Sequence, residues 1–369
     1  MAYENELYVC ARCGYCREVC PVKRLLGFEM VSPRGKILSH KYTLESGKRL
    51  SKELMENWYL CTTCGYCKEV CPTEIDFPEV VKSVRTDFVR RDLGSLEAFV
   101  SARKSVQSEG NPLGKLRAER AKWIPLDFTP PKKAECLYFA GCMASYWATE
   151  TATAIAEVLR KTNFNFGILG TNEPCCGMIS LWGGEKTITK EIAEKNLEII
   201  RGYGTKTLVT SCPGCYTTFT QDYPNLVGKL GFNVLHVSEL LTELIKDGKL
   251  KFQKEVSMVV TYHDPCHIGR FHRIFDSPRE IIRAIPGVKL VEMDYSKAEA
   301  NCCGGPLRTA YADYSIAISR LRAREAAETG ASTLLTFCPL CYINLRRAVR
   351  EEKLRLRVMD VPMLLTQAL

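Results

Sequence analysis

Hydrophobic and polar positions divide the chain into two parts with different periods. From position 136 to the end, short apolar runs typical of buried strands alternate with longer amphipathic segments typical of helices. The runs predicted to be strands are 137–140, 166–169, 207–210, 233–237, 256–262, 288–293, 333–337 and 356–361. The amphipathic segments 185–204 and 311–330 each end in glycine, a common helix stop. This alternation predicts small parallel α/β sheets.

The same region is an internal duplication. Both halves carry, in the same order, a single cysteine, a Cys-Cys-Gly triplet and a Cys-Pro-x-Cys pair. Corresponding cysteines are offset by 124, 127 and 126 positions: Cys142 and Cys266, Cys175 and Cys302, Cys212 and Cys338. A near-constant offset predicts two copies of one module, 135–254 and 255–369, each of plausible domain size. The cysteines follow strands, at the edge where parallel sheets bind ligands.

The N-terminal part lacks this alternation of strands and helices. Residues 1–95 hold two cysteine-rich runs, and the segment 48–58 between them has a helical pattern, so we expect an all-helical module. Residues 96–134 contain no cysteine but several glycines and prolines. We expect a linker there with one or two short helices.

Composition is that of a globular protein with a sizeable core: 369 residues, 46% hydrophobic and 25% charged. No apolar stretch is long enough to span a bilayer, and residues 1–10 lack the pattern of a signal peptide. We therefore expect a cytoplasmic location, with membrane association only through a partner protein. Nineteen cysteines in that reducing compartment favour metal or cluster ligation over disulfides.

The formal net charge of +9 is weak evidence for nucleic-acid binding, because clusters bound by thiolates are anionic and offset it. We expect no nucleic-acid partner. Basic residues concentrate between positions 80 and 133, and we interpret them as a solvated linker face. A docking surface for an acidic partner or an anionic membrane is the alternative. Examples are Arg85, Arg90, Arg91, Arg103, Lys104, Arg117, Arg120 and Lys122.

Two runs with the spacing C-x2-C-x2-C-x3-C-P lie in residues 1–95. This is the pattern of bacterial two-cluster ferredoxins, in which a tight loop supplies three ligands of a cubane [4Fe–4S] cluster and the fourth cysteine binds the other cluster. We predict two cubane clusters, one held by Cys10, Cys13, Cys16 and Cys71 and the other by Cys20, Cys61, Cys64 and Cys67. A structural zinc protein fits poorly, because zinc prefers paired C-x2-C knuckles.

Each copy of the duplicated module carries five cysteines. The sets are Cys142, Cys175, Cys176, Cys212 and Cys215, then Cys266, Cys302, Cys303, Cys338 and Cys341. Five thiols exceed the four that a cube or a zinc ion needs, and adjacent cysteines are awkward ligands for one tetrahedral ion. They suit a cluster in which one thiolate bridges two irons. Cys136 lies outside both sets and is expected to be a buried strand residue.

The order of these motifs resembles the CCG-domain iron–sulfur family. That family includes catalytic subunits of heterodisulfide reductase and iron–sulfur subunits of glycolate, lactate and glycerol-3-phosphate oxidoreductases. A ferredoxin module followed by two CCG modules is most similar to the D subunit of heterodisulfide reductase, and the segments 32–36 and 262–270 add to the likeness. The resemblance implies a noncubane [4Fe–4S] cluster held by all five cysteines of each module. It also implies a multidomain fold: a helical ferredoxin module, then two small Rossmann-like α/β modules.

Two noncubane clusters would support disulfide chemistry. Cleaving a disulfide needs two electrons and two protons, and two such clusters facing each other would each take one sulfur. His263 and His267 flank Cys266 and are candidate proton donors, since histidine titrates near neutrality; a supporting hydrogen bond is the alternative. Arg270 and Arg308 are candidates to bind a substrate carboxylate or phosphate, with ordinary salt bridges as the alternative.

Two functions of different classes follow. The first is that of a disulfide oxidoreductase subunit, in which two cubane clusters feed two noncubane clusters that cleave or form a disulfide. The alternative is an electron-relay subunit of a flavoprotein that oxidises a hydroxyacid or glycerol phosphate. The chain has no dinucleotide fingerprint or P-loop, so we expect no flavin or nucleotide on it. Expected partners are a membrane cytochrome b-type subunit, or a flavoprotein or iron–sulfur electron donor, together with a disulfide or thiol substrate.

Overall fold

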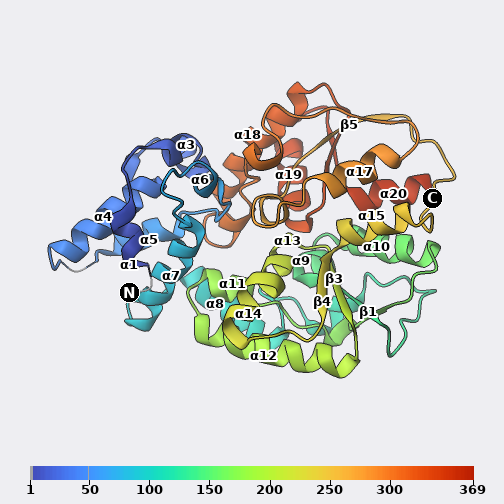
Figure 1. The fold of residues 1–369 in the computed structure, drawn as a ribbon, viewed down its shortest axis with the longest axis horizontal. Coiled ribbons are helices and arrows are strands. Elements are labelled where there is room, and N and C mark those ends of the chain that lie inside the picture. The colour runs from blue at the N-terminus through green and yellow to red at the C-terminus, as the bar shows by residue number, and fades with distance from the viewer. Residues whose placement is uncertain (1–2, 49) are drawn as a thin grey trace.

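The computed structural model describes residues 3–48 and 50–369. Figure 1 shows three parts: a helical N-terminal part in blue, a first α/β half in green and yellow, and a second α/β half in orange and red. The two halves lie one above the other, and the helical part lies against one side of both.

The N-terminal part contains only helices and turns among its described residues. Its α-helices are α1 (Glu4–Val9), α2 (Tyr15–Glu18), α3 (Pro21–Leu26), α4 (Pro33–Glu45), α5 (Lys52–Tyr59), α6 (Tyr66–Glu69) and α7 (Phe77–Arg90). Helix α4 begins where Ser32 accepts a hydrogen bond from the Gly35 N–H and Pro33 occupies the first helical position. The aromatic residues Trp58, Phe77 and Phe88 are buried between α5 and α7.

Residues 91–134 form α8 (Glu97–Glu109) and a 3-10 helix, η2 (Arg117–Ala121). Helix α8 buries Phe99, Ala102 and Val106 and packs against α11 of the first α/β half. The expected short helices are present, and they form part of the wall of that half.

The first half is a parallel sheet of four short strands in the order β2-β1-β3-β4. The strands are β1 (Cys136–Phe139), β2 (Phe166–Ile168), β3 (Thr207–Thr210) and β4 (Asn233–His236). Its α-helices are α9 (Gly141–Tyr146), α10 (Thr149–Lys161), α11 (Met178–Trp182), α12 (Lys186–Tyr203), α13 (Pro213–Thr217), α14 (Tyr223–Val227) and α15 (Val237–Lys246). Every residue of β1 is buried, Cys136 included, as expected for a central parallel strand.

The second half repeats this arrangement in the order β6-β5-β7-β8. Its strands are β5 (Met258–Tyr262), β6 (Val288–Leu290), β7 (Thr333–Thr336) and β8 (Arg357–Asp360). Its α-helices are α16 (Cys266–Gly269), α17 (Asp276–Ala284), α18 (Ala312–Glu328), α19 (Pro339–Glu351) and α20 (Val361–Ala368). The prediction of two parallel α/β sheets, with strands at these eight places, is confirmed.

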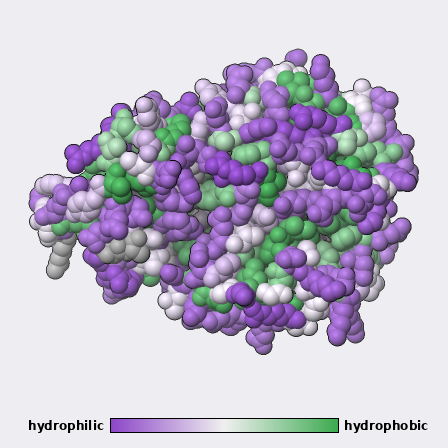
Figure 2. Space-filling view, in the orientation of Figure 1, coloured by the Kyte–Doolittle hydropathy of each residue, from purple (hydrophilic) through white to green (hydrophobic). Residues whose placement is uncertain are grey.

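The two halves share one hydrophobic core. Helix α10 packs on α20 and α15 packs on α17, so that Tyr138 and Val209 of the first sheet belong to the same buried cluster as Val260 and Leu335 of the second. The face seen in Figure 2 is largely hydrophilic, with separate hydrophobic patches. None of the described helices is both long enough and apolar enough to cross a membrane.

Candidate metal centres

The two N-terminal cysteine runs fold into loops of the same conformation. Arg12 and Thr63 occupy equivalent positions and both have positive φ, 59° and 48°, which is uncommon for residues other than glycine. Two residues later Gly14 and Gly65 also have positive φ and precede the short helices α2 and α6. This curl turns backbone N–H groups towards sulfur, and the Thr63 N–H donates to Cys61 Sγ at 3.4 Å.

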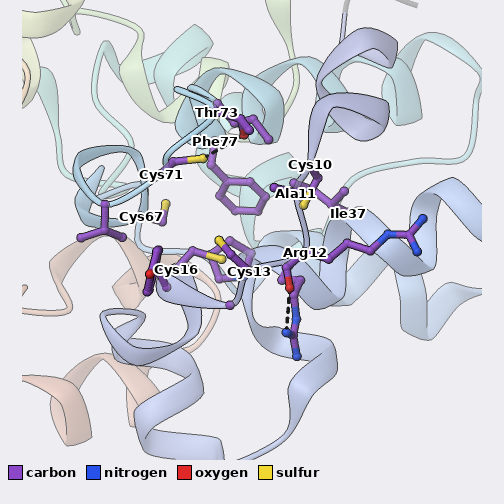
Figure 3. Close-up of a pocket in the computed structure, with 16 residues that line it drawn as sticks. Cys10, Ala11, Arg12, Cys13, Cys16, Ile37, Cys67, Cys71, Thr73 and Phe77 are labelled. Atoms are coloured by element: carbon purple, nitrogen blue, oxygen red, sulfur yellow. Dashed lines mark hydrogen bonds between the residues drawn. The ribbon is translucent and has the colours of Figure 1, made fainter.

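The loops exchange their fourth cysteines. Figure 3 shows one cavity with Cys71 and Cys67 across from the triplet of the other loop, Cys10, Cys13 and Cys16. A second cavity is bordered by Cys20, Cys61, Cys64 and Cys67. We call these the first and second cubane sites. All eight thiols are free, and the two sets of four converge as cubane [4Fe–4S] clusters require, so the donor chemistry fits the predicted groups.

The first five-cysteine set converges from three loops of the first half. Cys142 lies in the first turn of α9, the adjacent pair precedes α11, and the last two cysteines are at the start of α13. Neighbouring thiols contact one another in a chain: Cys142 with Cys175, Cys175 with Cys176, Cys176 with Cys215, and Cys215 with Cys212. We call this group the first CCG site.

A buried ion pair holds two of these loops together. Glu173 accepts hydrogen bonds from the Ala140 and Gly141 N–H groups, directly before Cys142, at 2.9 Å each. Arg120 of η2 donates to the Glu173 carboxylate at 2.7 Å and to the Pro174 carbonyl at 3.1 Å. The segment expected to be a linker therefore supplies a side chain that supports the first CCG site.

The second five-cysteine set converges in the same way and forms the second CCG site. Cys303 Sγ lies 3.2 Å from Cys341 Sγ. The Cys341 N–H donates to Cys338 Sγ and the Gly304 N–H to Cys302 Sγ, both at 3.3 Å. Cys302 also contacts Cys266, which completes the set.

The two predicted proton donors have different surroundings. His263 lies beside Cys303 and Cys341, with the three donor atoms within 4.8 Å of one another. Its Nδ1 accepts a hydrogen bond from Arg322 Nε at 3.1 Å, and since guanidinium only donates, the ring proton is on Nε2. Nε2 has no hydrogen-bond partner among the described residues, and the role of His263 as a proton donor stays a prediction.

His267 is buried, and burial lowers its pKa to about 3. Its ring stacks on Phe271, with centroids 4.6 Å apart, and its Nδ1 lies 3.2 Å from the Thr217 hydroxyl of the first half. The side chain also lines the cavity described next. Its role as a proton donor stays a prediction.

Both CCG sites open onto one cavity of about 680 Å³ between the two halves. Its cysteines are Cys142, Cys175, Cys176, Cys212, Cys215, Cys266, Cys303, Cys338 and Cys341. One wall is completed by α8 and by the turn 112–114. No motif or period in that segment indicated that it would border the site.

Three of the arginines singled out in the sequence are placed differently from expectation. Arg85 and Arg120 are buried, which contradicts a solvated linker face at these positions. Arg270 is buried and donates to the backbone carbonyls of Cys64, Ala298 and Ala300, so neither a substrate contact nor a salt bridge describes it. Arg308 does line the cavity, where its guanidinium lies over the Trp147 ring.

Family models match most of this architecture. The cysteine-rich CCG domain matches residues 136–220 and 260–346, and a 4Fe-4S dicluster domain matches residues 6–75. The chain is 34% identical to the D subunit of dihydromethanophenazine:CoB–CoM heterodisulfide reductase of Methanosarcina barkeri, over 99% of this chain and 94% of that protein. The chain belongs to the family of heterodisulfide reductase D subunits. The expected resemblance is thereby confirmed.

Another relative is also a subunit of an oxidoreductase. The chain is 30% identical to the B subunit of fumarate reductase (CoM/CoB) of Methanothermobacter marburgensis, over 99% of this chain and 73% of that protein. Among solved structures, a hypothetical protein from Helicobacter pylori is similar in fold, with a TM-score of 0.59 at 10% identity, covering 100% of this chain and 75% of that one. The chain is thus an iron–sulfur protein of an oxidoreductase family.

Proposed function

We propose that this member of the heterodisulfide reductase family passes electrons through two cubane clusters to two noncubane [4Fe–4S] clusters, which cleave or form a disulfide. The observation that carries the proposal is that all five cysteines of the first set and four of the second, all but Cys302, border one cavity of about 680 Å³. An electron relay needs no such shared chamber between its last two centres. The two relatives described above are named for heterodisulfide or CoM/CoB chemistry, which supports the same assignment.

The proposal assigns residues 1–95 to a helical ferredoxin domain, 96–134 to a connecting segment, and 135–254 and 255–369 to two Rossmann-like CCG modules. The parallel sheets and the family matches support this division. Cys10, Cys13, Cys16 and Cys71 would hold one cubane cluster, and Cys20, Cys61, Cys64 and Cys67 the other. The five cysteines of each CCG site would hold one noncubane cluster.

The reaction is RSSR′ + 2e⁻ + 2H⁺ → RSH + R′SH. The noncubane clusters would supply iron as the acceptor of each sulfur and as the source of one electron each. The protein would hold the disulfide between the two sites, with His267 and the Cys303 region on one wall and Met143 and Met178 on the other. His263, fixed by Arg322, would donate a hydrogen bond to the sulfur of Cys303.

Electrons would reach this cavity through the second CCG site. Cys64 of the second cubane site contacts Cys302 of the second CCG site, and these two sulfurs lie in one buried cluster with Tyr66. The first cubane site is the outer one, because Cys13 is exposed. Tyr8, Val9 and Tyr15 around it are also exposed, which suits a docking surface for a partner protein.

The substrate class follows from the cavity wall. Arg308 forms no salt bridge among the described residues and is held by Trp147 and by the Asn344 side-chain oxygen at 3.2 Å. An unpaired guanidinium facing a cavity suits a carboxylate, sulfonate or phosphate. We therefore expect a disulfide with at least one anionic arm. The electron donor would be a cytochrome b-type membrane protein or a flavoprotein.

Iron, acid-labile sulfide and zinc, measured on anoxically purified protein, test the cluster assignment. About sixteen irons per chain are expected for four [4Fe–4S] clusters. About eight irons, with zinc in the CCG sites, would leave two cubane clusters and the relay function instead.

Disulfide cleavage is tested with reduced methyl viologen as electron donor and a panel of anionic disulfides. Cys303→Ala is expected to abolish thiol release while the spectroscopic signals of the cubane clusters remain. Cys136→Ala, a buried cysteine outside all four sites, is the matched control and is expected to stay active. Normal turnover by Cys303→Ala would contradict the proposal.

A further inference from the structure

Six lysine and arginine side chains are buried in the described part of the molecule, and they fall into two groups. Arg120, Arg279 and Arg322 each form a salt bridge, with Glu173, Asp264 and Glu325 respectively. Lys36, Arg85 and Arg270 are exposed by only 1%, 2% and 5% and form none within the described residues. Burying a charge is costly unless an opposite charge or its equivalent compensates it. The second group therefore lacks a visible counter-charge.

Backbone carbonyls are the hydrogen-bond acceptors of all three. Lys36 donates to Val31, and Arg85 donates to Trp58, Tyr59 and Trp182. Arg270 donates to Cys64, Ala298 and Ala300. These bonds fix the side chains but supply no opposite charge.

The three cations come from distant parts of the chain and meet at one place. Lys36, in α4, borders the second cubane site together with its four cysteines. Arg85, in α7, interacts electrostatically with Cys61. Arg270, directly after α16, donates to the carbonyl of Cys64 and lies over the Tyr66 ring, 4.5 Å from its centroid.

The first cubane site has a different electrostatic setting. Of the cations near it, Arg12 is exposed, and Arg17 and Arg34 are paired with Glu29 at 2.6 and 2.8 Å and are partly exposed, with 33% and 23% of their side-chain surface accessible. Solvent screens such pairs, so they contribute little net field. The two sites have the same ligand loops, but only the second is surrounded by buried, unpaired positive charge among the residues that the structure describes.

We infer that Lys36, Arg85 and Arg270 are the counter-charge of the second cubane cluster and raise its reduction potential above that of the first. This inference rests on the proposed assignment of a cubane cluster to each site. Reduction adds one negative charge to a cluster that is already anionic, and nearby buried cations stabilise that charge more strongly than exposed pairs do. Electrons would therefore pass from the outer site to the second site and remain there, next to Cys302, until the disulfide takes them.

The test is a redox titration of the whole protein, followed by electron paramagnetic resonance. Cys13→Ser, in the first site, identifies which cubane signal belongs to that site. Lys36→Met is expected to lower the midpoint potential of the second cubane by at least about 59 mV, a tenfold fall in the equilibrium constant for electron transfer from first to second. The potential of the first cubane is expected to move less.

Lys41→Met is the matched control, because Lys41 lies on the same helix but outside the site and is paired with Glu45. A second pair of variants covers the case in which Lys36→Met loses its clusters: Arg270→Met is expected to lower the potential, and Arg270→Lys, which keeps the charge, to restore most of it. If Arg270 had a purely structural role, Arg270→Met and Arg270→Lys would not differ in potential according to their charge.

An unchanged potential in Lys36→Met with both cubane signals intact would overturn the inference. An equal shift in Lys41→Met would also overturn it, as would equal potentials for Arg270→Met and Arg270→Lys. These results leave the proposed function in place. Absence of both cubane signals from the unmodified protein would instead refute the function on which the inference rests.

Discussion

The two α/β halves have the same strand order and the same five-cysteine set, but they are supported differently. In the second half the buried carboxylate of Asp264, before α16, pairs at 2.7 Å with Arg279 of helix α17 in the same half. In the first half the carboxylate is Glu173, and its partner Arg120 comes from η2, outside the duplicated region. The two halves therefore share the five-cysteine pattern, but different residues hold the loops that carry it.

The walls of the two CCG sites also differ by an exchange of large and small residues. Met178 follows the Cys-Cys-Gly triplet of the first half, and Gly214 stands between its last two cysteines. In the second half these positions are Gly305 and Leu340. A Cβ on Gly214 would lie 2.6 Å from Met178 Sδ, and one on Gly305 would lie 2.9 Å from Leu340 Cγ. Each site therefore has room for one large side chain. In the first half it comes from the position after the triplet, and in the second half from the position between the last two cysteines.

The helices after the last cysteine pair differ as well. Helix α19 of the second half is continuous, whereas the first half has α13, a π-helical turn at Thr218–Asp222, and then α14. Thr217, at the end of α13, lies 3.2 Å from His267 Nδ1 of the second half. The first half therefore contacts the cavity wall of the second directly before this π-helical turn.

The largest expected effect concerns the buried ion pairs. Arg279→Met leaves Asp264 and Glu292 without their shared partner and is expected to cost about 3–5 kcal/mol of unfolding free energy. Arg120→Met leaves a single carboxylate, Glu173, without its partner, so the loss of unfolding free energy is expected to be smaller than for Arg279→Met. The effect on the cluster signal of the first CCG site is expected to be larger, because Glu173 holds the loop before Cys142. Denaturant unfolding under anoxic conditions measures both. Equal losses of unfolding free energy in the two variants, with no change in the signal of either CCG site, would show that the two ion pairs support their halves in the same way.

The exchange of large and small residues is tested by reversing it. Gly305→Met places a side chain against Leu340 and is expected to destabilise by about 1–3 kcal/mol through overpacking. Adding Leu340→Gly reproduces the first-half arrangement and is expected to recover most of the loss. Additive effects in the double variant would show that the two positions do not share one space.

The strand ends that precede α15 and α20 differ in their response to acid. His236 is buried and caps α15, and burial lowers its pKa to about 3. Its protonation therefore favours the unfolded chain, so stability present above pH 6.5 is lost as pH falls, by about 2 kcal/mol at pH 5. His236→Asn, which keeps a capping side chain, is expected to lose less over that interval. The same acid loss in both proteins would contradict this.

The counterpart of His236 is Asp360, which caps α20 and whose pKa is raised well above the ordinary value by burial. Its response has the opposite sign, because a carboxyl with a raised pKa binds its proton more tightly in the folded chain and so adds stability as pH falls. Asp360→Asn removes this compensation and is expected to enlarge the loss between pH 6.5 and 5. Unfolding at a series of pH values measures both variants.

The smallest expected effect is on substrate affinity. Arg308→Gln removes the cation from the cavity wall and is expected to raise the KM for an anionic disulfide about tenfold, roughly 1.4 kcal/mol, with little change for an uncharged one. Arg346→Gln, on α19 but paired with Glu150, is the control. Equal KM changes for charged and uncharged disulfides would show that Arg308 acts through packing alone.

Much of the fold was predictable because local signals carried it. Each strand is a short apolar run, and the glycines at 204 and 330 end α12 and α18 in the left-handed conformation that a helix stop requires. The spacing of the cysteine runs predicts that Cys71 and Cys20 bind the cluster of the opposite loop, and each borders the cavity beside the triplet of that loop. The interpretation of the basic segment failed at Arg85 and Arg120, because sequence alone does not tell a solvated cation from a buried one.

The sequence by itself determined the duplication and the family and predicted the donor sets, since these depend on residue identity and spacing along the chain. Only the tertiary structure decided that both CCG sites border one cavity, that α8 and the turn 112–114 complete its wall, and that Cys64 contacts Cys302. It also decided that Lys36, Arg85 and Arg270 meet at the second cubane site. These contacts join residues far apart along the chain, and the packing of separate modules, with no local pattern to mark it, brings them together.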